Sequence, residues 1–363
     1  MGITGTSPAV VRRAIKGKTA LPGTTGFAGE VDGRLVRDVL GRVPLFFERG
    51  DPTVWSHERR GLDAPQRLPA GAILDDEMIQ QHWTLPRKPA DPAATRIHAE
   101  RIRTAIDESL DSVAGDGLAV AFSGGLDSAI LAARLDGPLY TVGFPESHDV
   151  RAARDGARLL DCDLEVFELD HGMVEQAIPT VVDAIGTTNA MAVEIALPLY
   201  LLAEQVRSDG YERLALGQGA DELFGGYTKV AQAPEDPRVD ATTVRGARDE
   251  LLETLPEQLE RDGLATRAAG VDPVVPLVHD SVVETALSLP GKDLVSDRGE
   301  RKWALRLAAR RWLPDRIAFR EKKALQYGSL LARELDRLAR QNGFKRRQDD
   351  HVTQFIESRW NSV

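Results

Sequence analysis

Two short stretches combine glycines with acidic and hydroxyl side chains in a pattern suited to binding phosphate. The first, Ser123-Gly-Gly-Leu-Asp-Ser128, follows a short apolar run and precedes residues typical of a helix. Glycines have no Cβ, so main-chain N–H groups in such a turn can close on an anion, and a helix that begins there adds its positive dipole end. Asp127 could hold a magnesium ion that also binds phosphate oxygens. The stretch therefore predicts a pyrophosphate site.

An ordinary strand-to-helix turn is the alternative interpretation, since an acid is favoured in any first helical turn. The full six-residue pattern after a buried strand is much more specific than Gly-Gly alone. No lysine follows it, so it is not the Gly-x-x-x-x-Gly-Lys-Ser/Thr pattern.

The second stretch, Leu216-Gly-Gln-Gly-Ala-Asp-Glu222, again presents acids after an apolar strand and a glycine turn. If the two strands are neighbours, Asp127 and Asp221 would face the same crevice and share magnesium bound to a triphosphate. A solvated acidic turn is the alternative, and the presence of the first stretch argues against it.

A third region is basic. Only 9 of the 46 basic residues are lysines, and Lys302, Lys322 and Lys323 fall within 22 positions of one another. Lys302 and Arg306 are four residues apart, which predicts a shared helix face. A cation that reaches the α-phosphate would stabilise the charge that develops when a carboxylate attacks there. A solvated basic face is the alternative, and the scarcity of lysine favours a function for at least one of the three.

Alternating helices and strands must position these residues. Helices are predicted at about 96–110, 126–135, 148–160, 174–185 and 190–206, with the last broken or offset near Pro198, and strands at 118–122, 139–143, 164–169 and 213–217. Such alternation predicts a doubly wound parallel sheet whose ligand lies beyond the carboxyl ends of its strands. Val142-Gly143 would suit a pocket wall for adenine, although glycine also ends strands where no ligand binds. After residue 227 the pattern is mostly helical.

Residues 1–94 differ from the rest. Their short apolar runs are separated by Gly, Pro and Asp, which predicts hairpins rather than helices, and Pro86, Pro89 and Pro92 suggest a linker. We expect a small β-rich lobe over 1–94 that leans on a main domain over 95–363.

Composition narrows the class of protein. The 363 residues are 42% hydrophobic, enough for a substantial core, and the net charge of -10 argues against general nucleic-acid binding. The single Cys162 excludes internal disulfides. No apolar run approaches membrane-span length, so we expect a cytoplasmic protein without a membrane partner.

These motifs together resemble a known family. Ser123–Ser128 resembles the PP-loop of ATP pyrophosphatases (adenine nucleotide alpha hydrolase-like), and about residues 95–330 resemble the synthetase domain of the asparagine synthetase family. The resemblance also rests on 219–227, on 261–265 with Val275-Pro276, and on the pieces around Lys302, Arg306 and Lys322. It implies an α/β PP-loop fold with a helical C-terminal part, ATP and Mg²⁺ as ligands, and adenylation of a carboxylate, in the family the aspartate side chain, followed by aminolysis with ammonia.

Site residues follow from the same resemblance, position by position. The ATP and pyrophosphate site would contain Phe122, Ser123, Gly124, Gly125, Leu126, Asp127, Ser128, Val142, Leu216 and Gly217. Magnesium would bind Asp127 and Asp221, catalytic roles would fall to Asp221, Lys302 and Lys322, and the acceptor pocket would include Gln218, Glu222, Asp272 and Arg306.

Three departures from the family pattern modify this picture. Gly2 stands where the family's glutaminase domain has its nucleophilic Cys, and residues 33–71 look like only the last part of such a domain, so we expect no glutamine hydrolysis. Ammonia would then be free or come from a separate glutaminase subunit, and a homodimer is left open.

The other departures concern the acceptor. Gln218 replaces a glutamate, and Asp272–His279 lacks the family's arginine and aspartate, so the acceptor carboxylate can differ from aspartate. A ligase or cyclase acting on another carboxylate, as in the β-lactam-forming relatives, and a non-catalytic ATP-binding protein are the alternatives.

Overall fold

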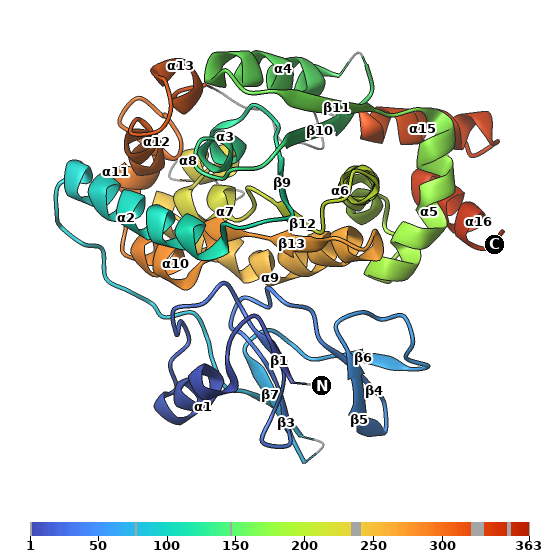
Figure 1. The fold of residues 1–363 in the computed structure, drawn as a ribbon, viewed down its shortest axis with the longest axis horizontal. Helices are drawn as coiled ribbons and strands as arrows, with labels where there is room; N and C mark the ends of the chain where they lie inside the picture. Colours follow the sequence, from blue (N-terminus) through green and yellow to red (C-terminus); the bar gives the residue numbers. More distant parts are fainter. Residues whose placement is uncertain are drawn as a thin grey trace. The chain divides into compact units, whose positions relative to one another are not determined.

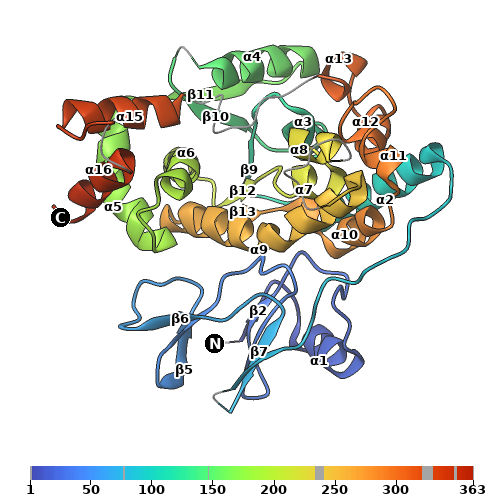
Figure 2. The same cartoon turned by 180° about the vertical axis from the view of Figure 1, so that it is seen from behind.

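The computed structural model describes residues 2–76, 78–145, 147–233, 241–320, 330–346 and 350–362 (Figures 1 and 2). The chain divides into two compact units, each built from three segments. The first unit contains Met1–Val113, Gly217–Glu260 and Val275–Trp312, and the second contains Ala114–Leu216, Arg261–Val274 and Leu313–Val363. The boundary expected between residues 94 and 95 stays a prediction.

A parallel sheet forms the centre of the second unit. Its strands lie in the order β11-β10-β9-β12-β13, and every neighbouring pair is parallel. The strands are β9 (Leu118–Ala121), β10 (Leu139–Gly143), β11 (Leu164–Glu168), β12 (Arg213–Ala215) and β13 (Asp272–Val274). The predicted parallel sheet is confirmed, and β9 is its switch point, since the chain adds strands first on one side of it and later on the other.

Helices of the second unit match the predicted alternation closely. They are α3 (Leu126–Ala132), α4 (His148–Leu160), α5 (His171–Ile185), α6 (Ala190–Ser208), α13 (Asp315–Ala318), α15 (Leu331–Gln341) and α16 (His351–Trp360). α6 runs through Pro198 as one helix, so the predicted break is wrong. Its side chains are buried almost continuously from Ala196 to Ala203, and this packing outweighs the hydrogen bond that proline removes. α16 lies beside α5 (Figure 1), and Trp360 Nε1 donates to Asp183 at 2.7 Å.

The N-terminal part of the first unit contains two antiparallel sheets, in the strand orders β1-β2-β3-β7-β8 and β5-β4-β6. These strands are β1 (Ile3–Thr4), β2 (Ala28–Val31), β3 (Arg34–Arg37), β4 (Phe46–Glu48), β5 (Asp51–Ser56), β6 (Pro65–Arg67), β7 (Ala72–Asp75) and β8 (Met78–Gln81). The predicted hairpins are confirmed. The expectation of no helix is wrong, because α1 (Pro8–Gly17) begins after Ser7, whose Oγ accepts from Val10 N. Ser followed by Pro is a helix-start signal that could have been used.

Helices make up most of the rest of the first unit. They are α2 (Thr95–Val113), α7 (Ala220–Phe224), α8 (Thr228–Gln232), the first part of α9 (Val244–Ala268), the 3-10 turn η1 (Pro276–Val278), α10 (Asp280–Leu287), α11 (Gly291–Leu294) and α12 (Trp303–Ala309). α2 packs against α10, α12 and η1, and Ser109 Oγ donates to the Pro276 carbonyl at 2.7 Å. α9 continues into the second unit from residue 261.

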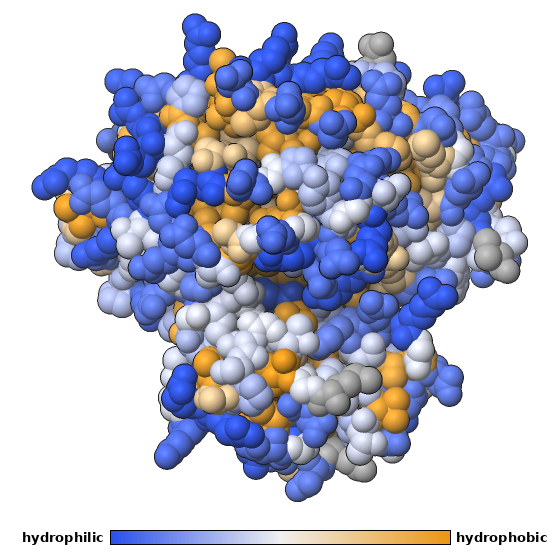
Figure 3. Space-filling view, viewed as in Figure 1, coloured by the Kyte–Doolittle hydropathy of each residue, from blue (hydrophilic) through white to orange (hydrophobic). Residues whose placement is uncertain are grey.

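Polar residues cover much of the face shown in Figure 3, with apolar areas between them. Among the helices of the described residues, none is by itself long and apolar enough to cross a membrane, and α5 and α6 pass that test only together, bent by 108°.

Candidate active site

The first glycine stretch connects the central strand of the second unit to a helix. β9 ends at Ala121, Gly125 immediately precedes α3, and Asp127 and Ser128 are buried in the first turn of that helix. Ser128 Oγ accepts from Ser123 N at 3.2 Å, donates to the Gly125 carbonyl at 3.3 Å and lies 3.2 Å from Ser123 Oγ. Two hydroxyl groups and the glycine backbone therefore close one compact loop.

A close approach of α4 explains why glycine is required in this loop. Gly124 has φ +70°, and a Cβ added there would lie 2.1 Å from the Ala152 carbonyl oxygen in α4. On the helix side, a Cβ added to Gly156 would lie 2.9 Å from Gly124 Cα and 3.0 Å from the Phe122 ring. Because backbone meets backbone, neither partner can yield as a side chain would. Main-chain packing therefore fixes the shape of the loop.

The strands that precede the two glycine stretches are hydrogen-bonded neighbours. Val120 of β9 pairs with Ala215 of β12, which confirms the predicted adjacency of these strands. Leu216 N donates to the Val274 carbonyl at 2.8 Å, so the pairing of β12 extends one residue past its end, and Gly217 follows.

Apolar residues predicted to line a nucleotide are buried, namely Phe122, Leu126, Val142 and Leu216. Gly143 has a separate explanation, because a Cβ there would lie 2.9 Å from Ser147 Oγ, the hydroxyl that caps α4 by accepting from Val150 N. The serine that caps α4 therefore explains why glycine is needed at this position, and the glycine does not by itself indicate an adenine site.

The second glycine stretch lies in the first unit and is shaped by side chains. Gly219 has φ +83° and precedes α7, and a Cβ added there would lie 2.0 Å from Val278 Cγ1. A Cβ added to Gly226 would lie 1.8 Å from Asp221 Oδ1 and 2.4 Å from Lys302 Cε. These glycines make room for the side chains of other segments.

An ion pair joins two residues that sequence analysis placed in the site. Lys302 Nζ lies 2.7 Å from Asp221 Oδ1; the lysine side chain is 7% exposed and the aspartate 40%. Lys302 has φ 57° and precedes α12, so it stands outside the helix that contains Arg306. The predicted common helix face of Lys302 and Arg306 is therefore wrong. Arg306 is buried, and its Nε donates to the Arg301 carbonyl at 2.7 Å.

Glu222, next to Asp221, is buried and bonded. Tyr227 Oη donates to Glu222 Oε1 at 2.5 Å, and Arg301 Nη1 donates to the Gly226 carbonyl at 2.6 Å. Burial raises the pKa of Glu222; the Tyr227 bond opposes that rise and the charge of Asp221 adds to it. Sequence reasoning missed Tyr227 and Arg301. The five-residue separation of Glu222 and Tyr227 across Gly225-Gly226 is the signal that could have found Tyr227, because two glycines allow the chain to reverse.

Three further predicted residues are Gln218, in the second glycine stretch, Asp272, at the far end of the sheet, and Lys322, outside the described residues. Gln218 is partly buried and directly precedes Gly219. Asp272 begins β13, pairs with Arg213 at the amino end of β12 and forms an ion pair with Arg267. It lies at the end of the sheet opposite to the strand ends that carry the glycine stretches. Lys322 falls outside the described residues; Arg320, two positions earlier, donates to the Ala152 carbonyl at 3.1 Å.

Within each unit, the structure thus brings together one set of predicted residues: Ser123, Gly124, Gly125, Asp127 and Ser128 in the second unit, and Asp221, Glu222, Lys302 and Arg306 in the first. Among the described residues, no group of three or more His, Cys, Asp or Glu side chains is arranged to hold a metal ion by itself. A magnesium site here would therefore need phosphate oxygens as further ligands.

Comparison with known proteins gives a consistent result. A sequence model of the asparagine synthase family matches residues 99–251 and 235–355. A glutamine-hydrolyzing asparagine synthetase assigned in Methanocaldococcus jannaschii is 30% identical, over 89% of this chain and 71% of the relative.

Two further relatives are more distant. Asparagine synthetase B of Escherichia coli is 26% identical over 85% of this chain and 61% of its own length, and asparagine synthetase 1 of Arabidopsis thaliana is 26% identical over 81% and 55%. The chain thus spans between about half and 71% of the length of these relatives.

Proposed function

Because the chain belongs to the asparagine synthase family, we propose that it is an ATP-dependent carbon–nitrogen ligase that forms an amide. A carboxylate, by similarity the side chain of aspartate, attacks the α-phosphate of ATP, and pyrophosphate leaves. Ammonia then attacks the acyl-adenylate, loses a proton and displaces AMP. The observation that carries this proposal is the direct pairing of β9 with β12, the two strands that lead into the glycine stretches.

The first stretch binds the pyrophosphate. Gly124 and Gly125 offer main-chain N–H donors, and the hydrogen bonds of Ser128 Oγ to Ser123 N and to the Gly125 carbonyl hold the loop in place, so these donors need little reorganisation when charge develops. The backbone contact between Gly124 and α4 supports this role, because it gives the loop one shape. The buried Phe122, Val142 and Leu216, with Leu126 and Gly217, form the nucleotide's apolar surroundings.

Asp127 and Asp221 hold the magnesium ion. Each lies six residues after the last residue of its strand, and carboxylate oxygens are the ligands that magnesium prefers. When bound, magnesium supplies positive charge to the triphosphate. Lys302 Nζ, 2.7 Å from Asp221 Oδ1, orients that carboxylate.

Lys302 and Lys322 are the catalytic cations. Their ammonium groups stabilise the negative charge that builds up at the α-phosphate during attack. The role of Lys322 rests on the family resemblance alone, because this residue lies outside the described residues.

The acceptor side contains Gln218, Glu222 and Arg306, and the position of Asp272 at the amino end of β13 gives no support for adding it to them. Gln218 cannot accept a proton as a carboxylate does, and Glu222 is bonded to Tyr227. These observations favour a second candidate function, in which the same adenylation serves another carboxylate, as in the β-lactam-forming relatives.

Ammonia reaches the site as a free species or from a separate glutaminase subunit, and the chain does not hydrolyse glutamine itself.

Pyrophosphate release tests the proposal. Purified protein is incubated with magnesium, ATP, ammonium and one carboxylate at a time, starting with aspartate, and AMP, ADP and pyrophosphate are measured. We expect equal amounts of AMP and pyrophosphate, no product when glutamine replaces ammonium, and at least a ~100-fold loss in Asp127→Ala. Formation of ADP and phosphate would contradict the mechanism, and a response to another acid but not to aspartate would favour the second candidate.

A further inference from the structure

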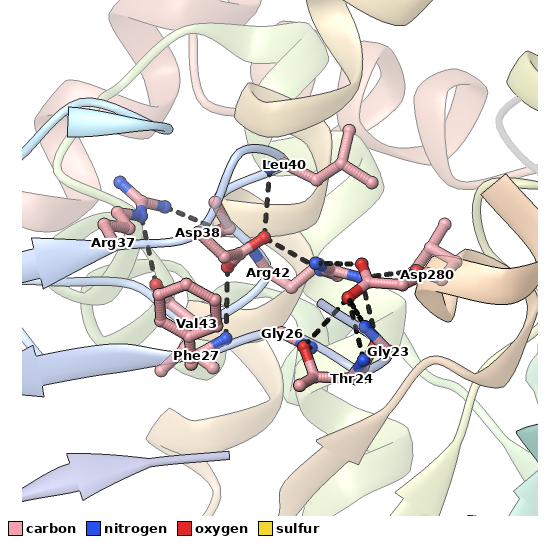
Figure 4. Close-up of polar contacts among 12 residues, drawn as sticks. Gly23, Thr24, Gly26, Phe27, Arg37, Asp38, Leu40, Arg42, Val43 and Asp280 are labelled. Atoms are coloured by element: carbon pink, nitrogen blue, oxygen red, sulfur yellow. Dashed lines mark hydrogen bonds and ion pairs between the residues drawn. The ribbon is translucent and has the colours of Figure 1, made fainter. Parts of the chain in front are cut away.

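A buried network of charges ties the N-terminal strands to the segment between β13 and α10. Figure 4 shows Asp38 and Arg42, from the connection that follows β3, beside Asp280, the first residue of α10. The side chains of Asp38 and Arg42 are 0% exposed and that of Asp280 is 2% exposed. All three belong to the first unit.

Asp280 is held by the chain before β2. Its Oδ2 accepts from Gly23 N at 2.9 Å, from Thr24 N at 2.7 Å and from Thr24 Oγ1 at 3.2 Å (Figure 4). Its own main-chain N donates to the Thr24 carbonyl at 3.0 Å. The start of α10 is therefore bonded to a loop more than 250 positions earlier in the chain.

Arg42 connects four residues, since its Nη1 also donates to the Thr24 carbonyl at 3.3 Å. Its Nε donates to Asp38 Oδ1 at 2.8 Å, its Nη1 donates to the Val278 carbonyl at 2.8 Å, and its Nη2 lies 2.8 Å from Asp280 Oδ1. Burial by itself lowers the pKa of Arg42, but the charges of Asp38 and Asp280 outweigh it, so the net shift is upward and the guanidinium stays charged. Only the planar fork of arginine offers donors in these three directions.

Val278 links this network to the second glycine stretch. A Cβ added to Gly219 would lie 2.0 Å from Val278 Cγ1, so Val278 stands directly against the turn that leads to Asp221. Arg42 holds the carbonyl of that same Val278, and Ser109 of α2 holds the carbonyl of Pro276.

We propose that Arg42 is a positioning residue through which the N-terminal strands hold Val278 against Gly219 and so fix the loop that carries Asp221. The catalytic part of this inference rests on the proposed function. The N-terminal strands then serve the ligase site directly, independently of any glutamine hydrolysis. The competing explanation is that the network only stabilises the fold. Buried ion pairs contribute little net stability, because the cost of removing both charges from water offsets their attraction.

Arg37 provides a matched control for that explanation. It is as buried as Arg42, it lies in the same part of the chain, and its guanidinium also binds several groups. Its Nε, Nη1 and Nη2 donate to the carbonyls of Val43, Leu68 and Gly41 at 3.0, 2.9 and 2.7 Å, and Nη1 lies 2.7 Å from Glu260. Among the bonds identified for the described residues, none of these reaches Val275–Asp280.

The test compares Arg42→Lys with Arg37→Lys in the full-length protein. Each substitution keeps the positive charge of the side chain and removes the planar guanidinium with its several donors. Thermal unfolding shows how far each variant is destabilised. Hydrogen–deuterium exchange of residues 217–226 is the readout that does not depend on catalysis. We expect Arg42→Lys to speed exchange there at least about fivefold and Arg37→Lys to leave it unchanged at a similar loss of stability.

Activity gives the second readout. In Arg42→Lys the kcat for pyrophosphate release should fall at least about tenfold, because a displacement of about 1 Å can cost on the order of 100-fold, while the KM for ATP stays within about twofold. Val278→Ala, which leaves the charges in place, should also speed exchange in 217–226. Equal exchange and equal kcat in the two lysine variants would overturn the inference. If the wild-type protein released no pyrophosphate while the exchange difference persisted, only the proposed function would fail.

Discussion

The two glycine-and-acid stretches look alike in sequence but are held in place in different ways. In the first, Gly124 lies against the backbone of α4, and Asp127 is buried. In the second, Gly219 and Gly226 lie against side chains, and Asp221 is 40% exposed in an ion pair. A loop held by backbone has one shape, whereas a loop held by side chains takes its shape from distant parts of the chain. The same sequence pattern can therefore encode a rigid loop and an adjustable one.

The largest effect is expected from adding a methyl group at each of the two positive-φ glycines. In Gly124→Ala the new Cβ meets the Ala152 carbonyl oxygen, which is part of a helix, and the left-handed conformation costs a further ~1–2 kcal/mol. We expect ATP binding to be lost and pyrophosphate release to fall by more than ~100-fold. Calorimetric titration with ATP and thermal unfolding measure both effects.

Gly219→Ala should be milder because its obstacle, Val278 Cγ1, is a side-chain atom. The double variant Gly219→Ala/Val278→Ala should recover part of the lost activity, whereas no single side-chain truncation can relieve Gly124→Ala. Normal ATP binding by Gly124→Ala, or no recovery in the double variant, would remove the distinction between the two loops.

A smaller effect is expected when the ion pair in the second loop is broken. Lys302→Met leaves Asp221 without the ammonium 2.7 Å away, so we expect kcat to fall about 10- to 100-fold. Stability should change by only ~1 kcal/mol, because the 40% exposed carboxylate is screened by water. Lys88→Met, which breaks the exposed pair with Glu284, is the matched control and should leave kcat unchanged. Equal kcat values in the two variants would show that the Lys302 pair has only a structural role.

The pH dependence of stability should have opposite signs in two parts of the molecule. Burial raises the pKa of Glu222 above 4.5, so the native state keeps this proton to a higher pH than the unfolded chain does. The contribution of Glu222 is fully present below pH 4.5 and is lost as the pH rises through its native pKa. Glu222→Gln removes this titration, so its melting temperature relative to wild type should rise between pH 4.5 and pH 8. A constant difference over that range would contradict the prediction.

Asp336 on α15 should behave in the opposite way and with the smallest effect. Arg346 Nη2 donates to its Oδ2 at 2.6 Å and His351 Nε2 lies 2.9 Å from its Oδ1. The Arg346 bond, against burial and with help from His351, holds the pKa of Asp336 below 3.8. This contribution is fully present above pH 3.8 and is lost as the pH falls through the lowered native pKa. Asp336→Asn should cost about 1 kcal/mol at pH 7, and the cost should be smaller at pH 3, where only part of the contribution remains; urea unfolding at pH 7 and pH 3 measures it.

Local patterns were sufficient to predict most of the second unit. Buried strands, glycine turns and helix periodicity are encoded within a few residues, so β9 to β12 and the helices between them were predicted within a few positions. β13 was indicated only by resemblance, because three residues after a long helix carry little pattern of their own. The parallel arrangement followed from the alternation of strands and helices. When a helix connects two neighbouring strands of a sheet, the strands run parallel.

The organisation of the first unit was much less predictable. The contact of Arg42 with Val278 joins residues 236 positions apart, and no sequence pattern connects the two residues. The left-handed conformation of Lys302 likewise depends on its pairing with Asp221 and not on the helical spacing to Arg306. Contacts of this kind form only when separate segments fold together. The periodicity of residues along one segment therefore cannot predict them.

The position of β9 at the centre of its sheet has a consequence for how the protein is made. One side of β9 can pair as soon as β10 leaves the ribosome, but its other partner, β12, is about 90 residues further along the chain. At ~5–20 residues per second, this apolar strand edge stays open for several seconds or longer during synthesis. The strand that leads into the first glycine stretch is thus also a part of the nascent chain that needs protection from aggregation.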